Sequence, residues 1–206
     1  MMNEFETTTH PDMAALFDVA SGQMGYFTTS QARDYGFRGN LLTYHVKTGR
    51  FLRVYRGVYR FRDFPSSPRE EVMAAWLAVG KDKAVVSHES ALDLLELSDV
   101  IPNAVHLTVP RSVRNLPSIH GVKIHTTVRP FEPRDLRSWD GMRHTSAERT
   151  ILDAAEVGVD IAQVHKAIQD AVSRGKTTRS QMARAVQTRS LRVQNIVLSG
   201  LEELRP

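Results

Sequence analysis

The apolar residues near the start of the chain recur with helical spacing. This spacing predicts a helix over residues 11–21, with one apolar face made of Met13, Leu16, Phe17 and Ala20. Thr28-Thr29-Ser30-Gln31 then has the form of a capping box, in which Thr28 is the N-cap and Gln31 reaches back to it. The sequence therefore predicts a second helix, which ends at Tyr35-Gly36.

A third helix and two strand-like runs follow at once. The helix is expected over residues 38–48 and is closed by Gly49 in the usual position after the last turn. Short β-type runs occupy residues 51–54 and 58–61, and Tyr55-Arg56-Gly57 joins them. Three helices followed by a two-stranded hairpin is the order of a winged helix-turn-helix.

A segment rich in proline and serine, residues 63–67, separates this pattern from the next one. Ser67-Pro68-Arg69-Glu70 supplies an N-cap serine, a proline at the first helical position and a glutamate two residues later, which predicts a helix start. Residues 72–79 are apolar all round, so this helix is expected to be buried.

The rest of the chain alternates between strand and helix signals. Val85-Val86 is a candidate strand, and apolar residues alternate with polar ones at 105–109 and 122–126, which predicts two half-buried strands. Helical patterns return from Thr145 onward. We predict an α+β protein with an N-terminal winged helix-turn-helix domain followed by a mixed helix/strand C-terminal domain, with bounds 1–64 and 65–206.

Three hydroxyl side chains in the second domain stand where helix N-caps are expected. Ser87 precedes a helix that carries several leucines. Thr145 with Glu148, and Thr178 with Gln181, have the spacing of capping boxes. We therefore expect these residues to begin three helices.

Positive charge is concentrated in the predicted winged helix. The whole chain has a net charge of +4, but the segment from Gly25 to Arg62 holds eight basic residues and the single acid Asp34. Eight minus one gives +7 for this segment, so the remainder of the chain sums to −3. Such segregation favours a polyanion-binding module on a near-neutral body, with an ordinary solvated basic surface as the alternative.

In a helix-turn-helix, the second helix of the motif lies in the DNA major groove. Here that helix is residues 38–48, whose inward face carries Leu42, His45 and Val46. The opposite face carries the residues that we expect to contact DNA, namely Arg38, Asn40, Thr43, Tyr44 and Lys47. Arginine pairs with guanine, asparagine with adenine and threonine with the thymine methyl group, whereas Lys47 is placed to meet phosphate.

The predicted wing adds basic side chains that can neutralise the DNA backbone: Arg53, Arg56 and Arg60, with Arg56 at the tip near the minor groove. Many winged helices instead contact proteins, so the order of elements alone leaves that alternative open. Arg38 stands where a serine or threonine cap would be expected, which makes the start of the recognition helix weak.

Several segments resemble the AbiEi antitoxin family of type IV toxin–antitoxin systems. They are Gly25–Gly36, Lys47–Tyr59, Val86-Ser-His-Glu-Ser-Ala-Leu92, Val105-His-Leu-Thr-Val-Pro110 and Thr145–Asp153. The most specific element is Arg-Gly-Val-Tyr in the wing. The resemblance implies a winged helix that represses its own operon and a second domain that counteracts a nucleotidyltransferase toxin, in the setting of abortive infection. It leaves open whether the toxin is bound, modified or opposed at its target.

Composition excludes several classes of protein. There is no cysteine, so disulfides and thiolate metal sites are excluded. The first thirty residues lack the pattern of a signal peptide, and no apolar run approaches the roughly 18 residues of a membrane span. We expect a cytoplasmic protein with no membrane partner. Some AbiEi relatives continue into a nuclease-like domain; this sequence ends at Pro206, so we expect none.

Other patterns with catalytic or metal-binding residue types have simpler interpretations. Arg174-Gly-Lys-Thr177 lacks the first glycine of a P-loop, and Ser87-His88-Glu89 is explained by a helix N-terminus. His106 and His125 face outward on their strands and meet if those strands pair; we interpret them as surface residues. Arg149 and Asp153 have the spacing of a helical ion pair. We expect no metal, no cofactor and no catalytic residue.

Basic residues of the second domain are interspersed with Glu132, Asp135 and Asp140, so we interpret them as a mixed solvated face rather than an extended nucleic-acid surface: Arg111, Arg114, Lys123, Arg129, Arg134 and Arg137. The resulting hypothesis is a non-enzymatic antitoxin and autorepressor. Its partners are operator DNA with inverted repeats and a cognate nucleotidyltransferase toxin, and self-association on DNA is left open. The alternatives are an enzyme that modifies the toxin or its substrate, and a repressor without a toxin partner.

Overall fold

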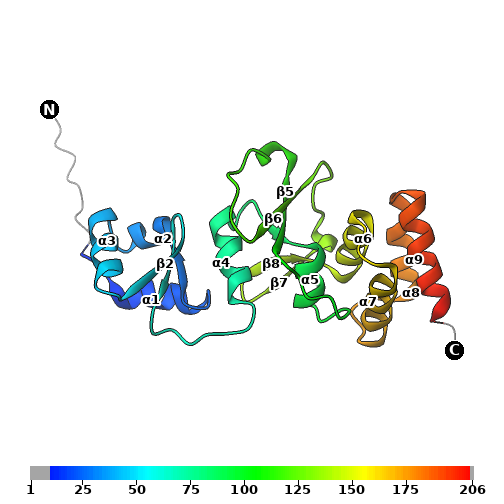
Figure 1. The fold of residues 1–206 in the computed structure, drawn as a ribbon, viewed down its shortest axis with the longest axis horizontal. Helices are drawn as coiled ribbons and strands as arrows, with labels where there is room; N and C mark the ends of the chain where they lie inside the picture. The colour runs from blue at the N-terminus through cyan, green and yellow to red at the C-terminus, as the bar shows by residue number, and fades with distance from the viewer. Residues whose placement is uncertain (1–9, 205–206) are drawn as a thin grey trace. The chain divides into compact units, whose positions relative to one another are not determined.

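The computed structural model describes residues 10–204 and has an α+β fold, as predicted (Figure 1). The chain divides into two compact units between Ala78 and Val79. This division falls fourteen residues beyond Phe64, the end of the predicted winged-helix domain, and it leaves nearly all of the helix at residues 70–79 in the first unit. No helix in the described part of the chain is both long and apolar enough to cross a membrane.

The first unit has the predicted helices and hairpin, with one short strand added to the sheet. Its elements are α1 (Met13–Ser21), β1 (Tyr26–Thr28), α2 (Thr29–Asp34), α3 (Gly39–Lys47), β2 (Phe51–Tyr55), β3 (Val58–Phe61) and α4 (Glu70–Val79). The strands pair antiparallel in the order β1-β3-β2. The core of this unit is mainly aromatic and is built from Leu16, Ala20, Phe27, Ala32, Phe37, Leu42, Phe51 and Phe61.

Local chemistry explains where these helices begin and end. The Thr28 hydroxyl accepts a hydrogen bond from the Gln31 backbone N–H at 3.2 Å, and the Gln31 side chain accepts one from the Thr28 N–H at 2.9 Å, so the predicted capping box is confirmed. Gly49 has a φ of +77°, which a glycine adopts without steric cost. Arg38 is the N-cap of α3 and makes no capping hydrogen bond with its side chain among the described residues.

Helix α4 begins slightly later than the predicted start at Ser67. Arg69 has a φ of +64°, which places it outside the helix, and α4 starts at Glu70. The Glu70 carboxylate still accepts a hydrogen bond from the Ser67 N–H at 3.3 Å. Residues 72–77 are all buried, as their uniformly apolar sequence predicts.

The second unit places a five-stranded sheet beside a group of helices. The sheet is built from β4 (Val85–Val86), β5 (Val105–Pro110), β6 (Val122–Thr127), β7 (Leu136–Trp139) and β8 (Met142–Thr145), in the order β6-β5-β4-β8-β7. The pairs β5–β6 and β4–β8 are parallel, and the other two are antiparallel. Strand β6 is half-buried as predicted, whereas β5 is buried on both faces because α5 (His88–Leu94) packs against it.

Four helices complete the second unit: α6 (Ala147–Val157), α7 (Ile161–Ser173), α8 (Arg179–Ala185) and α9 (Leu191–Glu203). Their apolar faces meet in one core cluster with α5, which includes Leu92, Ile151 and Ile168. Helix α9 crosses α7 closely at Gly200, where an added Cβ atom would lie 2.8 Å from His165 Cδ2.

Of the three predicted caps in this unit, Thr145 is wrong, Ser87 is right in position only, and Thr178 is right. The α6 cap is Ser146, whose hydroxyl accepts from the Arg149 N–H, while the buried Thr145 hydroxyl lies 2.6 Å from that of Thr150. Ser87 occupies the N-cap position of α5 but makes no capping bond with its side chain in the described part of the chain. The Thr178 capping box of α8 is confirmed.

Candidate nucleic-acid interface

Helix α3 separates its apolar and polar residues in the way that the sequence predicts. Leu42 is 2% exposed and packs in the core, and His45 and Val46 are half-buried beside it. The residues predicted to contact DNA are exposed on the helix: Arg38, Asn40, Thr43, Tyr44 and Lys47. Tyr44 is 58% exposed, a large value for an aromatic side chain. The structure therefore presents these five side chains to solvent together.

His45 belongs to the core side of α3 rather than to the exposed face. Its ring lies 5.0 Å from that of Phe51 and 5.7 Å from that of Phe37. Burial, together with the nearby Arg50, lowers the pKa of His45 below its ordinary value. The positive charge on the exposed face comes from Lys47 in α3 and from Arg38 at its N-cap.

Hydrogen bonds within α3 define what Asn40 and Thr43 present to a ligand. The Asn40 side-chain oxygen accepts from the Leu41 N–H at 2.9 Å, so its amide N–H groups are the donors that it offers. The Thr43 hydroxyl donates to the Gly39 carbonyl at 2.8 Å, which orients its methyl group on the helix surface. An amide donor and a methyl group are suited to reading base edges in the major groove.

The wing is formed by β2 and β3 and is anchored to the start of α2. The Gly57 carbonyl at the turn accepts hydrogen bonds from the Thr29 N–H at 2.9 Å and from the Thr29 hydroxyl at 3.3 Å. Arg53 and Arg56 are exposed on this hairpin, and a β-bulge between Arg53 and Tyr55 shifts the register there. Both arginines are accessible to a polyanion, as expected.

Arg60 is the one predicted contact residue that does not share this exposed surface. It is 6% exposed, pairs with Glu70 at 3.0 Å and donates to the carbonyls of Phe64 and Pro65 at 2.9 and 3.1 Å. Its guanidinium also lies over the Tyr26 ring, 5.6 Å from the centroid. The prediction that Arg60 contacts DNA is incompatible with this burial. The sequence could have indicated this burial, because side chains two residues apart lie on the same face of a strand and Arg60 lies two residues after the buried Val58.

Three further exposed arginines were missed as individual contact candidates: Arg33, Arg50 and Arg62. Arg33 near the end of α2 and Arg50 between α3 and β2 are both exposed and add to the positive charge of the first unit. They contribute to the net charge of the segment from Gly25 to Arg62. The helix-turn-helix pattern in the sequence does not show where they lie relative to the recognition helix.

The first unit thus has the architecture of a winged helix-turn-helix with an exposed face of basic and polar side chains. Residues 14–62 match the family described as "Transcriptional regulator, AbiEi antitoxin", so the predicted resemblance is confirmed over the winged helix. A solved structure similar to the whole chain is that of the RV2827C protein from Mycobacterium tuberculosis, with a TM-score of 0.61. The match has 14% identity and covers 96% of this chain and 80% of that chain, so it shows the fold alone. No curated protein matches the sequence.

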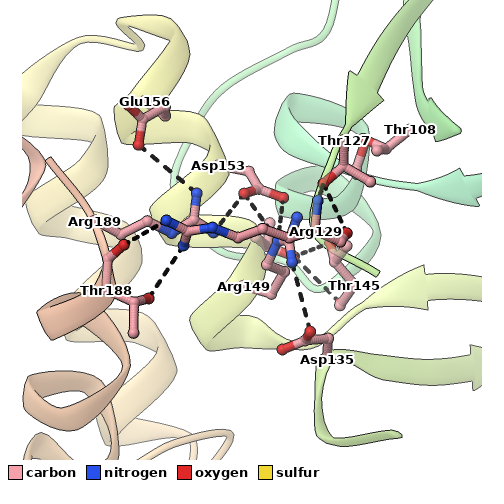
Figure 2. A network of polar contacts seen from close by, with 12 residues as sticks. Thr108, Thr127, Arg129, Asp135, Thr145, Arg149, Asp153, Glu156, Thr188 and Arg189 are labelled. Atoms are coloured by element: carbon pink, nitrogen blue, oxygen red, sulfur yellow. Dashed lines mark hydrogen bonds and ion pairs between the residues drawn. The ribbon is translucent and has the colours of Figure 1, made fainter. Parts of the chain in front are cut away.

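The second unit contains a polar network around Asp153 (Figure 2). The predicted ion pair is present: Arg149 Nε lies 3.0 and 2.8 Å from the two carboxylate oxygens of Asp153. Arg189 Nη2 approaches the same carboxylate at 2.7 Å, and Asp135 lies 3.5 Å from Arg149. The side chains of Arg149, Asp153 and Arg189 are each at most 11% exposed. The pair is therefore part of a larger, largely buried network.

Three histidines cluster beside this network. The His88 and His125 rings stack with centroids 3.6 Å apart, and His125 Nε2 lies 3.3 Å from His106 Nδ1, so the predicted meeting of His106 and His125 is confirmed. Their interpretation as surface residues is wrong for His106, which is 0% exposed. Burial lowers the pKa of His88 to about 2 and those of His106 and His125 to about 4. Among the described residues no group of three potential ligands is arranged to hold a metal ion.

Ser87 and His88 are hydrogen-bonded, but inside the unit. The Ser87 hydroxyl lies 2.8 Å from His88 Nδ1 and 2.7 Å from the Thr108 hydroxyl, and Ser87 is 0% exposed. This corrects the expected capping role of Ser87. The contacts link the start of α5 to β5, which supports a structural role for the pair.

Proposed function

We propose that this protein is a DNA-binding autorepressor whose α3 reads operator bases while Arg53 and Arg56 in the wing contact the backbone. The observation that carries the proposal is the exposed set on α3, placed beside a basic wing within the segment that matches a transcriptional-regulator family. Helix α3 has the donors and the methyl group needed for base readout, and the wing has the charge needed for phosphate. Operator DNA with inverted repeats is the proposed ligand.

A promoter reporter tests autorepression. The DNA upstream of this gene is fused to a reporter, and the full chain is supplied in trans. Wild type should lower reporter output, and the combined substitution Arg38→Ala, Asn40→Ala and Lys47→Ala should restore it. Arg114→Ala, an exposed arginine in the second unit, serves as the control. Repression that survives the triple substitution would contradict the proposed role of α3.

We further propose that the second unit counteracts a nucleotidyltransferase toxin encoded beside this gene, and that the protein acts in the cytoplasm without catalysis of its own. The family match over the winged helix and the presence of a separate compact unit support this assignment. Co-expression of the full chain with the neighbouring gene product should restore growth. The triple α3 variant should protect equally well, because its substitutions lie outside the second unit. A neighbouring gene product that is not toxic would instead favour a repressor without a toxin partner.

A further inference from the structure

A groove of about 740 Å³ lies in the second unit, between the segment that follows β6, the start of α6 and the chain from α8 to Arg189. Its lining holds three carboxylates, those of Glu132, Asp135 and Glu148, and six arginines: Arg129, Arg134, Arg137, Arg149, Arg184 and Arg189. Arginine thus outnumbers acid two to one in the groove, against 18 basic and 15 acidic residues in the whole unit. A cavity of this volume is within the usual range for small-molecule ligands.

Three of the arginines have no carboxylate within ion-pair distance in the part of the chain that the structure describes: Arg129, Arg137 and Arg184. The Arg129 guanidinium is instead held by Thr188, donating to its carbonyl at 2.8 Å and to its hydroxyl at 3.3 Å (Figure 2). Arg137 donates to the Leu136 carbonyl at 2.7 Å. Like charges gathered at one surface repel one another, so a bound anion would stabilise this arrangement.

The deeper arginines of the groove are already oriented. Asp153 holds Arg149 and Arg189, and the Arg149 guanidinium also lies over the Phe131 ring, 5.0 Å from the centroid. A guanidinium has five N–H donors, so each retains donors beyond those given to Asp153. Fixed arginine side chains lose little conformational entropy on binding, and their planar forks match the oxygens of phosphate.

We propose that this groove binds a polyphosphate ligand of nucleotide size, a nucleoside triphosphate. Several phosphates in a row match several arginines along one groove better than a single monovalent anion does, and the volume leaves room for a nucleoside. This site belongs to the second unit alone and is separate from the proposed DNA-binding role of α3. It replaces the interpretation of Arg129, Arg134 and Arg137 as a mixed solvated face.

Isothermal titration calorimetry on the full chain at low ionic strength tests the proposal with three probes: ATP, inorganic triphosphate and adenosine. ATP and triphosphate should bind, adenosine should not, and ATP should bind more tightly than triphosphate because it also fills the nucleoside part of the groove. Affinity should fall as salt is raised, since exposed charges are screened. The absence of measurable heat with both phosphate probes at millimolar concentration would overturn the proposal, as would binding of triphosphate without any gain for ATP.

Substitutions locate the site. Arg129→Ala and Arg184→Ala should each weaken ATP binding about tenfold, the loss expected for one hydrogen bond to a charged group. These residues are chosen because neither of them pairs with Asp153, and a thermal melt checks that each variant is folded. Arg114→Ala controls for general basic charge in the same unit, and Arg53→Ala controls for binding to the wing. Loss of ATP binding in Arg53→Ala with retention in Arg129→Ala would place the ligand elsewhere and contradict the assignment.

Discussion

The carboxylate of Glu70 lies 3.0 Å from the guanidinium of Arg60, and this ion pair connects β3 to the start of α4. The Arg60 side chain is 8% exposed and that of Glu70 is 26% exposed, so the pair is largely removed from solvent. Arg60 also donates hydrogen bonds to the carbonyls of Phe64 and Pro65, which lie in the segment between β3 and α4. Arg60 therefore stabilises the connection that leaves the wing.

The first prediction follows from this contact. Arg60→Ala should lower the free energy of unfolding by roughly 2–4 kcal/mol, because the Glu70 carboxylate loses its ion-pair partner and the carbonyls of Phe64 and Pro65 lose a donor. Urea denaturation followed by circular dichroism measures the loss. Arg53→Ala, an exposed arginine on the neighbouring strand, should change stability by no more than about 0.5 kcal/mol. An Arg60→Ala protein as stable as wild type would show that the pair is not structural.

The second prediction separates base readers from phosphate contacts. Asn40→Ala or Thr43→Ala should cost roughly 1–3 kcal/mol in binding to operator DNA and little in binding to random DNA. Arg53→Ala and Arg56→Ala should weaken both and should reduce the dependence of affinity on salt. Competition binding with the two DNAs distinguishes these patterns. Equal losses on both DNAs for Asn40→Ala would place a different element in the groove.

The third prediction concerns Asp153, which accepts hydrogen bonds from both Arg149 and Arg189. Asp153→Ala should destabilise the second unit by about 3–5 kcal/mol, because two largely buried arginines lose their common partner. Asp99→Ala is the matched control: Asp99 pairs with Lys166 at 3.6 Å but is exposed, and exposed pairs contribute little. Thermal melts of the two variants should therefore differ clearly. Similar melting temperatures would argue against a structural role of the network.

The fourth prediction is a loss of stability at acidic pH. Burial lowers the pKa of His106 and His125 from 6.5 to about 4, so between these values the unfolded chain binds more protons than the folded one. Stability is thus fully present above pH 6.5 and decreases as the pH falls towards 4. Between pH 7 and pH 5 the decrease should be on the order of a few kcal/mol. The midpoints of urea denaturation at pH 7 and pH 5 measure this loss of stability. The difference between the two midpoints should shrink in His106→Gln but persist when the exposed His120 is replaced.

Features governed by neighbours in sequence could be predicted from the sequence. The Thr28 capping box, the Gly49 helix end and the inward face of α3 each depend on residues within one or two helical turns, and the structure has all three. The ion pair of Arg149 with Asp153 was visible for the same reason, since four residues separate its members.

Features that depend on distant pairing could not be predicted in this way. The partner of Arg60 lies ten residues further along the chain, and Arg189 reaches Asp153 across 36 residues. His106 is buried because β5 lies between β6 and β4 inside the sheet. The alternation of apolar and polar residues within β5 does not reveal its place in the sheet. The arginine-lined groove likewise joins segments from β6 to α8, and their residues are interspersed with acids in the sequence.

Sequence readout by α3 is tested by a fluorescence anisotropy titration of the full chain against the DNA upstream of its own gene and against a scrambled duplex. We predict tighter binding to the upstream DNA, an affinity that falls steeply with salt, and loss of the preference in the combined Arg38→Ala, Asn40→Ala and Lys47→Ala protein. Equal affinity of the wild-type protein for both duplexes, or an unchanged preference in the triple variant, would contradict sequence readout by α3.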